Sequence, residues 1–492
     1  MTAITFPALK RPALAALLAA MVLAGCATPE AVDPAALPAV PAGFKEADSG
    51  RWTVAAPADM QERGAWWRLF SDPVLDGLAE RAALHNTDLQ GAAARLAQAR
   101  ALLRVSDAAR APQLQAQAGA LREAPPGMGG RAATLLSAGL GLSYEADLVG
   151  RLSAATRAAT LDAQAREALL QSTRLVVQAD VAYTYLTLRA LDSERRLVRD
   201  TLLAYGDTLR LTERRFEAGD VAELDVARVR TEVAATEAEA LALDRQRAEL
   251  EHALAVLVGE PASSFAVVDL AASGQPLPQV ELPHVPPGLP STVLARRPDV
   301  AAAQRSLMAA QERVGIARAA WFPSLALTAS GGHASGELSD LFEWSARAWS
   351  VGALLSLPIF DGGRREAGVQ TARAELDAAL AAYRQQVLTA FRDVEDQLSG
   401  LRLLAQQSQL QQRAVESAAR ATALSASRYR NGLVSQLELL DAQRSELRNR
   451  RQALVVQAAQ YQATVGLIRA LGGGWEGPAE GDAPPSRKQA SL

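Results

Sequence analysis

Cysteine is almost absent from this chain: among its 492 residues, only Cys26 carries a thiol. A single cysteine excludes a disulfide framework and a cysteine-rich metal site. Histidine is scarce as well, with four scattered residues, and the sequence contains no His-Glu-x-x-His, phosphate-binding loop or nucleophile elbow. Basic runs are lacking, and 51 Lys and Arg against 54 Asp and Glu give a formal charge of −3, which argues against a nucleic-acid partner. We therefore expect neither an enzyme nor a bound cofactor.

The one cysteine follows a short secretory signal. Lys10-Arg11 supplies a positive segment, residues 13–22 are apolar, and Leu23-Ala24-Gly25-Cys26 comes next. This tetrapeptide resembles a bacterial lipobox, which predicts removal of residues 1–25 as a signal peptide and lipidation of Cys26 at a membrane. An ordinary secretory signal and a short membrane anchor are the alternatives, although the apolar stretch is too short to span a bilayer. Residues 26–65 begin rich in proline and alanine, and they are expected to form an extended, lipid-anchored tether.

The most informative feature that is present is an internal repeat. Residues 142–259 align without a gap with residues 355–472 when the second stretch is shifted back by 213 positions, as 472 minus 259 shows. At this shift, Arg215-Phe216-x-x-Gly219-x-Val221-x-x-Leu224 matches Arg428-Tyr429-x-x-Gly432-x-Val434-x-x-Leu437. The glycine of each motif can adopt a positive φ and reverse one helix into the next. Duplication over this length indicates a repeated structural element rather than an active site.

Short stretches of alternating polarity are the candidate strands. Residues 136–145, 324–330 and 349–357 alternate apolar with small or polar side chains, and residues 113–117 fit as a weaker fourth strand. Pro112 and Pro323 precede the first strand of each repeat and are 211 positions apart, so the second copy has two extra residues between its strands. Such alternation fits a half-buried sheet in a soluble domain. It also fits a membrane barrel with lipid outside and water inside.

Long stretches without proline follow the strands in both repeats. Residues 151–218 would form a helix of roughly 100 Å at about 1.5 Å per residue, longer than a globular core requires. Leu243, Leu250 and Leu257 are seven apart, and the same spacing recurs in the second repeat, which favours coiled-coil hairpins over an ordinary bundle. The predicted boundaries are 66–259 and 296–472 for the two repeats, 260–295 for a proline-rich linker and 473–492 for a flexible tail.

Four strands cannot close a membrane barrel by themselves. Barrels need about eight strands or more, and an open edge in hydrocarbon leaves backbone groups unpaired. If these strands lie in a membrane, several chains must share one barrel. The predicted fold class is therefore mainly α-helical with a membrane β-barrel portion, built from internally duplicated protomers that contribute four strands each and continue as a long α-helical coiled-coil tunnel.

Motifs along the whole chain resemble those of one family of channels. They are Trp66-Trp67-x-x-Phe70-x-Asp72-Pro73-x-Leu75, Asn86-x-Asp88-Leu89, Arg297-Pro298-Asp299-Val300, Trp321-Phe322-Pro323-Ser324, Leu357-Pro358-Ile359-Phe360-Asp361-Gly362-Gly363, and Tyr429-Arg430-Asn431-Gly432 with Leu440-Asp441-Ala442. Their order in a duplicated chain resembles the TolC-like outer-membrane efflux channels, in the lipoprotein branch that serves resistance-nodulation-division (RND) pumps. Ala27 after the cysteine, where an aspartate would signal retention in the inner membrane, agrees with that location.

The resemblance implies an architecture, a function and partners. It implies a homotrimer with a 12-stranded barrel among outer membrane lipids and a helical extension in the periplasm. Such a channel conducts drugs or other small solutes passively, receiving them from a periplasmic adaptor (a membrane fusion protein) and an inner-membrane RND-type pump.

The resemblance also assigns roles to residues near the two helix-reversing turns. It places adaptor docking at the helical tips, here Gly219, Gly432, Leu433, Val434 and Ser435. It places a periplasmic gate at Asp225, Tyr429, Glu438 and Asp441. In a trimer these carboxylates would form acidic rings that favour cations and raise one another's pKa. Helix capping and solvated helix faces are the simpler interpretations of the same residues.

Two further features bear on the resemblance. The best-known relatives carry a basic, gate-closing residue where this chain has Val434, so Arg228 or Arg444 is the candidate replacement. Aromatic residues near the expected strand ends favour an interfacial belt over packing against a soluble sheet. They are Trp321, Phe322, Phe342, Trp344 and Trp349.

Other functions fit parts of the sequence. A lipid-anchored coiled-coil scaffold without a pore explains Cys26 and the heptads but gives the four strands no role. A periplasmic adaptor has one hairpin in a β-rich chain, whereas this chain has two hairpins and few strands. The outer-membrane conduit of a type I protein secretion system is the nearest alternative among channels, but the lipobox and Arg297-Pro298-Asp299 favour efflux of small solutes.

Overall fold

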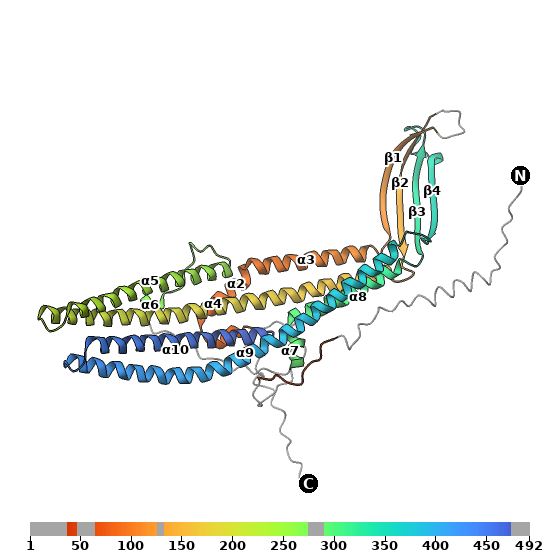
Figure 1. Cartoon of the computed structure of the whole chain (residues 1–492). Coiled ribbons are helices and arrows are strands. Elements are labelled where there is room, and N and C mark those ends of the chain that lie inside the picture. The colour runs from red at the N-terminus through yellow and green to blue at the C-terminus, as the bar shows by residue number, and fades with distance from the viewer. Residues whose placement is uncertain (1–36, 47–63, 125–131, 274–289, 474–492) are drawn as a thin grey trace, which may run out of the picture. The chain divides into compact units, whose positions relative to one another are not determined.

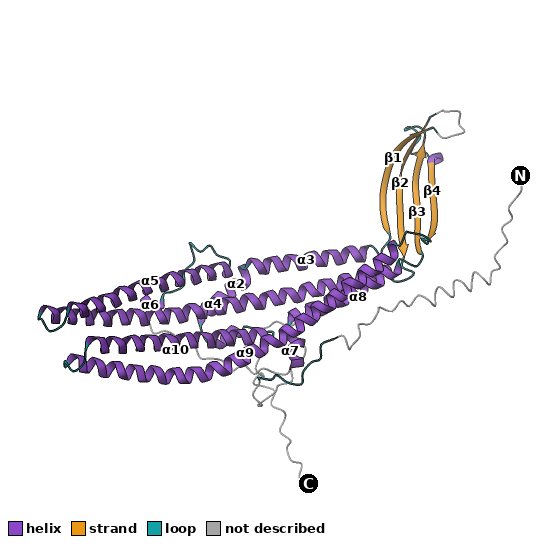
Figure 2. Cartoon of the chain, in the orientation of Figure 1, coloured by secondary structure: helices purple, strands orange, loops and turns teal. Residues whose placement is uncertain are grey.

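The computed structural model describes residues 37–46, 64–124, 132–273 and 290–473. The predicted signal peptide 1–25, Cys26, much of the predicted tether and nearly all of the predicted tail lie outside these residues. The described elements, drawn in Figures 1 and 2, are η2 (Trp66–Phe70), α2 (Pro73–His85), α3 (Thr87–Ala108), β1 (Gln113–Glu123), β2 (Ala133–Ala146), α4 (Arg151–Glu217), α5 (Glu223–Val258), α6 (Leu270–Ser273), α7 (Pro290–Arg296), α8 (Pro298–Ala319), β3 (Ser324–Ser335), η3 (Trp344–Ala346), β4 (Arg347–Ser356), α9 (Arg364–Arg430) and α10 (Gln436–Ala470).

These elements separate into two compact units, one of which contains the sheet and comprises residues 94–167 and 302–386. Figure 2 shows its four strands as adjacent arrows, and they pair antiparallel in the order β1-β2-β3-β4. The predicted weak strand is confirmed and is longer than expected, at 11 residues. Across the described part of the chain, no helix has the length and apolar character that crossing a bilayer needs.

The pairing of the strands gives the sheet two chemically different faces. Directly opposite residues point to the same side, so Leu114 joins Leu142 on one face and Gln115 joins Gly141 on the other. The first face is exposed and apolar, with Leu114, Leu140, Leu142, Leu327, Trp349, Val351 and Leu355. The second carries mostly glutamine, serine and glycine. The alternation predicted from sequence is therefore confirmed.

The internal repeat extends to the pairing of individual strand residues. Gln113 pairs with Ser143, and Ser324, 211 positions after Gln113, pairs with Ser356, 213 positions after Ser143. The loop between β3 and β4, residues 336–346, is two residues longer than the loop between β1 and β2, residues 124–132. This difference confirms the two extra residues predicted for the second copy.

The other unit comprises the described residues within 39–93, 168–301 and 387–473, and it contains two helical hairpins. Figure 1 shows α4 with α5 and α9 with α10 lying side by side, each pair joined by a short turn. α4 and α9 have 67 residues each, as their lack of interior proline predicts. Leu191 and Val198 of α4 pack on Leu243 of α5, so the seven-residue spacing contributes to the hairpin core.

The main core of this unit lies where the Trp66 motif meets the helices. Asp72 caps α2 by accepting hydrogen bonds from the backbone N–H groups of Val74 and Leu75 at 2.9 and 3.2 Å, and Pro73 occupies the first turn, where its missing N–H costs nothing. The capped helix packs with η2 against α4 and α5. The cluster includes Trp66, Phe70, Leu75, Leu78, Tyr185, Leu186, Leu254 and Val258.

Two segments are more ordered than the sequence predicts. The described parts of the linker contain the short helices α6 and α7. Within the predicted tether, Phe44 is buried with Val293 and Val394, and the backbone N–H of Lys45 donates to Glu395 Oε1 at 2.7 Å. Burial of an aromatic ring outweighs the extended preference of the proline-rich stretch around it. Folded structure thus begins before Trp66.

Candidate functional site at the helical tips and between the hairpins

Each hairpin turn is built around a glycine in the left-handed region. Gly219 has φ +80° and Gly432 has φ +73°. In the first turn the N–H of Asp220 donates to the carbonyl of Arg215 at 2.8 Å, and in the second the N–H of Leu433 donates to the carbonyl of Arg428 at 2.9 Å. These bonds satisfy carbonyls at the helix end that have no partner within the helix. The two predicted tips therefore share one backbone design.

Apolar side chains are exposed at both tips. Leu433 is 67% exposed, and Phe216, Leu224 and Leu437 are exposed as well. Val434 is half-buried. Ser435 caps α10, since its hydroxyl accepts from the N–H of Glu438 at 3.4 Å. An exposed apolar surface on short, defined turns suits contact with another protein.

Tyr429 lies between the two hairpins and is 2% exposed. Its hydroxyl is 3.4 Å from the hydroxyl of Thr212 on α4, which also lies 3.4 Å from Gln436 Oε1 on α10. The guanidinium of Arg215 stacks over the Tyr429 ring at 4.6 Å and donates to the Tyr429 carbonyl at 3.3 Å. The arginine that contacts Tyr429 within the chain is thus Arg215, which the sequence marked only as part of the turn motif.

The three predicted gate carboxylates each lie near an arginine. Asp225 is 3.5 Å from Arg228, Glu438 is 3.7 Å from Arg428, and Asp441 is 3.6 Å from Arg444. No ion pair or hydrogen bond of the described chain joins these carboxylates to Tyr429 or to one another. Of the two candidate replacements for a basic residue at Val434, Arg228 stays on α5, and Arg444 also reaches Glu232 of the other hairpin.

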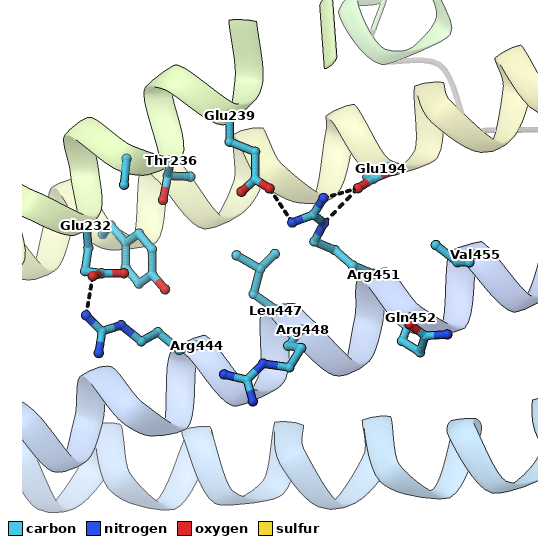
Figure 3. Close-up of a pocket in the computed structure, with 12 residues that line it drawn as sticks. Glu194, Glu232, Thr236, Glu239, Arg444, Leu447, Arg448, Arg451, Gln452 and Val455 are labelled. Carbon is cyan, nitrogen blue, oxygen red and sulfur yellow. Dashed lines mark hydrogen bonds and ion pairs between the residues drawn. The ribbon is translucent and has the colours of Figure 1, made fainter. Parts of the chain in front are cut away.

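A ladder of ion pairs crosses from α10 to the first hairpin (Figure 3). Arg444 pairs with Glu232, and seven residues on Arg451 pairs with Glu239, itself seven residues after Glu232. Arg451 also donates to Glu194 of α4 at 2.7 Å. We call these contacts the inter-hairpin ladder. Equal spacing on both helices means that the two hairpins run in matched register here.

The inter-hairpin ladder borders a polar groove of about 620 Å³, whose other lining residues include Thr236, Leu447 and Arg448. Tyr205 also lines the groove, but its hydroxyl is buried and has no hydrogen-bond partner among the described residues. Burial raises the pKa of Tyr205 to about 12, and the nearby charge of Glu232 adds to the rise. The phenol therefore stays neutral at ordinary pH.

A buried charged network fastens the linker to the first hairpin. Arg247 donates to Asp192 at 3.0 Å and to the Val267 carbonyl at 2.8 Å, while Arg195 pairs with Asp192 and Asp269. All charges in the cluster have opposite partners, as buried charges require. This pairing fits a structural role.

The same cluster continues through Tyr185. Its hydroxyl donates to Asp72 at 2.6 Å and accepts from Arg189 Nε at 2.9 Å. Burial, followed by the hydrogen bond to Asp72, raises the pKa of Tyr185. Among the residues that the structure describes, no three His, Cys, Asp or Glu side chains are grouped to hold a metal ion.

Comparison with known proteins identifies close relatives of this architecture. A family model described as outer membrane efflux protein matches residues 78–260 and 289–473. The chain is 35% identical over 479 residues to the pyoverdine export outer membrane protein OpmQ of Pseudomonas aeruginosa, covering 95% of this chain and 98% of the relative. It is 35% identical to the toluene efflux pump outer membrane protein TtgI of Pseudomonas putida, covering 82% and 86%. Among solved structures, the CmeC outer membrane channel of Campylobacter jejuni matches with a TM-score of 0.82 and 25% identity, covering 92% of this chain and 96% of the channel.

Proposed function

This chain belongs to the outer membrane efflux protein family, and we propose that three copies of it form one outer-membrane channel that passively conducts small solutes delivered from the periplasm. The chain is the outer-membrane component of an efflux system, in agreement with the relatives named for efflux and export. Solute export of this kind needs a path and no bond-making chemistry.

The observation that carries this proposal is the sheet. It has an exposed apolar face, an opposite face of mostly glutamine, serine and glycine, and open edges at β1 and β4. Lipid suits the first face and a water-filled lumen suits the second. Open edges require further strands, and three copies supply the 12 strands predicted for a closed barrel.

The helical tips are proposed to receive the periplasmic adaptor, which in turn binds an inner-membrane RND-type pump. Support comes from the exposed Phe216, Leu224, Leu433 and Leu437 at the turns around Gly219 and Gly432. Ser435 serves the site by capping α10, and Val434 lies half-buried beside it. Single apolar side chains on a rigid turn give a partner shallow anchor points.

The gate is proposed to combine Tyr429 with the carboxylates of Asp225, Glu438 and Asp441. Within one chain Tyr429 holds the two hairpins together, whereas the carboxylates act across the symmetry axis of the trimer. Lipidation of Cys26 is proposed to hold the assembly at the outer membrane in addition to the barrel.

Planar-bilayer conductance of the purified, lipidated protein tests the channel, with the oligomer mass measured in the same detergent. We expect trimers and discrete conductance steps. A silent trimer would indicate a closed gate, to be retested with the double substitution Glu438→Ala and Asp441→Ala. Monomers without conductance would contradict the channel and favour the lipid-anchored scaffold.

A further inference from the structure

The two outer strands of the sheet each lack a neighbour on one side. Among the described residues β1 pairs only with β2, and β4 only with β3. In the proposed trimer, on which this inference rests, β4 of one copy must pair with β1 of the next, because unpaired backbone groups are costly in hydrocarbon. The proposed function leaves open which residues of the two strands face each other.

The duplication supplies a template for this contact. The β2–β3 pair joins the last strand of the first repeat to the first strand of the second, and β4 with β1 of the next copy is a junction of the same kind. In a ring of three duplicated chains, the six junctions between repeats are equivalent whenever the repeats are equivalent. One of these junctions is therefore visible inside a single chain.

The equivalence of the repeats holds for individual bonds, also away from the sheet. The side-chain amide of Asn86 donates to the carbonyl of Leu257 at 2.9 Å, and Arg297 Nη1 donates to the carbonyl of Ala470 at 3.1 Å. Arg297 lies 211 positions after Asn86, and Ala470 lies 213 positions after Leu257. These are the same two shifts that relate β1 to β3 and β2 to β4.

We infer that β4 pairs antiparallel with β1 of the next copy so that Leu354 lies opposite Gly119 and Gly352 lies opposite Leu121. The β2–β3 pair sets Gly141 opposite Ser330 and Gly139 opposite Gly332. Moving the β2 residues forward by 213 positions gives Leu354 and Gly352. Moving the β3 residues back by 211 positions gives Gly119 and Leu121.

The side chains of the edge strands support this register independently. Leu121 of β1 and Leu354 of β4 are the exposed leucines that the two edge strands place on the more polar face, where β2 adds Leu135 opposite Leu121. Opposite Cβ positions are about 4.5–5.5 Å apart, so a glycine leaves room for a leucine on the partner strand. A shift of two residues in either direction would set Leu354 opposite Leu121 or Gln117. The inferred register is the one that gives both leucines a glycine.

The other face agrees with the same pairing. Leu355 falls opposite Ala118, and Ala353 falls opposite Ala120. A slip of one residue would place these apolar side chains opposite the polar face of the next copy. The apolar surface therefore continues across the junction without a break.

Disulfide crosslinking of the full-length protein in outer membranes tests the register. Ser356→Cys combined with Gln117→Cys places two thiols directly opposite, and antiparallel partners are about 4.5–5.5 Å apart between Cα atoms, within reach of a disulfide. Because β1 and β4 are opposite edges of one sheet, such a bond joins different copies. The matched controls combine Ser356→Cys with Gln115→Cys or with Gly119→Cys, which are two positions out of register. The parent chain, with Cys26 alone, controls for the native thiol.

We expect oxidation to convert most of the Ser356→Cys, Gln117→Cys protein into covalent trimers on a non-reducing gel, while the controls stay largely monomeric. The oligomer mass of each variant is measured before oxidation. If the trimers of a control variant crosslink, or if all variants form trimers but none crosslinks, the inferred register is wrong, while the proposed channel still stands. Absence of any oligomer would overturn the proposed function itself.

Discussion

Two buried tyrosines of α4 show how strongly one hydroxyl group depends on its surroundings. Tyr185 donates to Asp72 and accepts from Arg189, whereas the hydroxyl of Tyr205 has no partner among the described residues. A buried hydroxyl without a hydrogen bond costs about 1–3 kcal/mol, and a hydrogen bond to a charged group contributes about 1.5–3 kcal/mol. Replacing tyrosine by phenylalanine should therefore destabilise the fold at Tyr185 but not at Tyr205.

We predict that Tyr185→Phe lowers the free energy of unfolding by about 2 kcal/mol and that Tyr205→Phe leaves it unchanged or raises it by about 1 kcal/mol. Thermal unfolding of both variants in detergent, followed by helical circular dichroism, checks this. Each variant is the size-matched control for the other. Equal destabilisation by both would show that ring packing, and not hydrogen bonding, decides the outcome.

Tyr205 also predicts a pH dependence. Its pKa is about 12 in the folded chain, above the ordinary value of 10. The folded state thus holds the phenol proton more tightly, so the related stability is complete below pH 10 and is lost as the pH rises through 12. Tyr205→Phe should therefore lose less stability than the parent chain between pH 9 and 12. Unfolding temperatures measured over this range check this, and equal losses in the two proteins would contradict the role of Tyr205.

Single residues of the site were predictable only where a local pattern marked them. Gly219 and Gly432 were predictable, because a helix reversal needs a positive φ at one position. The contacts of Arg215 and Thr212 with Tyr429 were not predicted, because they join residues more than 210 positions apart. The burial of Phe44 was not predicted for a similar reason, since Val293 and Val394, on which it packs, are far from it in the sequence.

At the scale of elements, the inter-hairpin ladder joins helices of different repeats. Arg451 and its partner Glu239 are each about one-third exposed, so the pair should contribute about 1 kcal/mol, less at high salt. We predict that Arg451→Glu, which adds a third carboxylate beside Glu194 and Glu239, lowers the unfolding temperature. Adding Glu239→Arg to this variant should restore part of the lost unfolding temperature, because the pair then has opposite charges again.

Thermal unfolding at low and high salt measures this effect, with Arg448→Glu as the matched control on the same helix, because no ion pair of Arg448 occurs in the described chain. The double variant should recover stability most clearly at low salt, where screening is weak. If it is no more stable than Arg451→Glu alone, the ladder does not join the hairpins energetically.

The elements themselves followed closely from the sequence. Absence of proline marked the two 67-residue helices, and alternation marked the strands. The ladder also had a signal: opposite charges at seven-residue spacing on the last helix of each repeat. No sequence signal marked the linker helices α6 and α7, because helices this short depend on their surroundings more than on their own residues.

At the scale of the whole molecule, the gate role proposed for the carboxylates near the tips depends on the symmetry of the trimer. Glu438 and Asp441 are exposed, and each lies near one arginine within its chain. Around a three-fold axis they would form acidic rings that attract cations. We predict that Glu438→Ala with Asp441→Ala reduces the preference for cations over anions severalfold while the trimer persists.

Reversal potentials in a salt gradient measure this preference, and Glu446→Ala, one turn and a half farther along α10, is the control. Unchanged ion selectivity in the double variant would contradict the acidic rings. A change of equal size in Glu446→Ala would point instead to the general charge of the helix.

The inter-hairpin ladder has a mechanical consequence. Four of its five members, Glu232, Glu239, Arg444 and Arg451, correspond in the other repeat to Ser445, Gln452, Thr231 and Ala238, which carry no charge. A ring of three chains would then alternate contacts that contain this ladder, inside each chain, with contacts that lack it, between chains. Force applied at the periplasmic end would first separate the contacts between chains, which lack the ladder. The helical tube would separate into three chains, each with its two hairpins held together, and not into six independent hairpins.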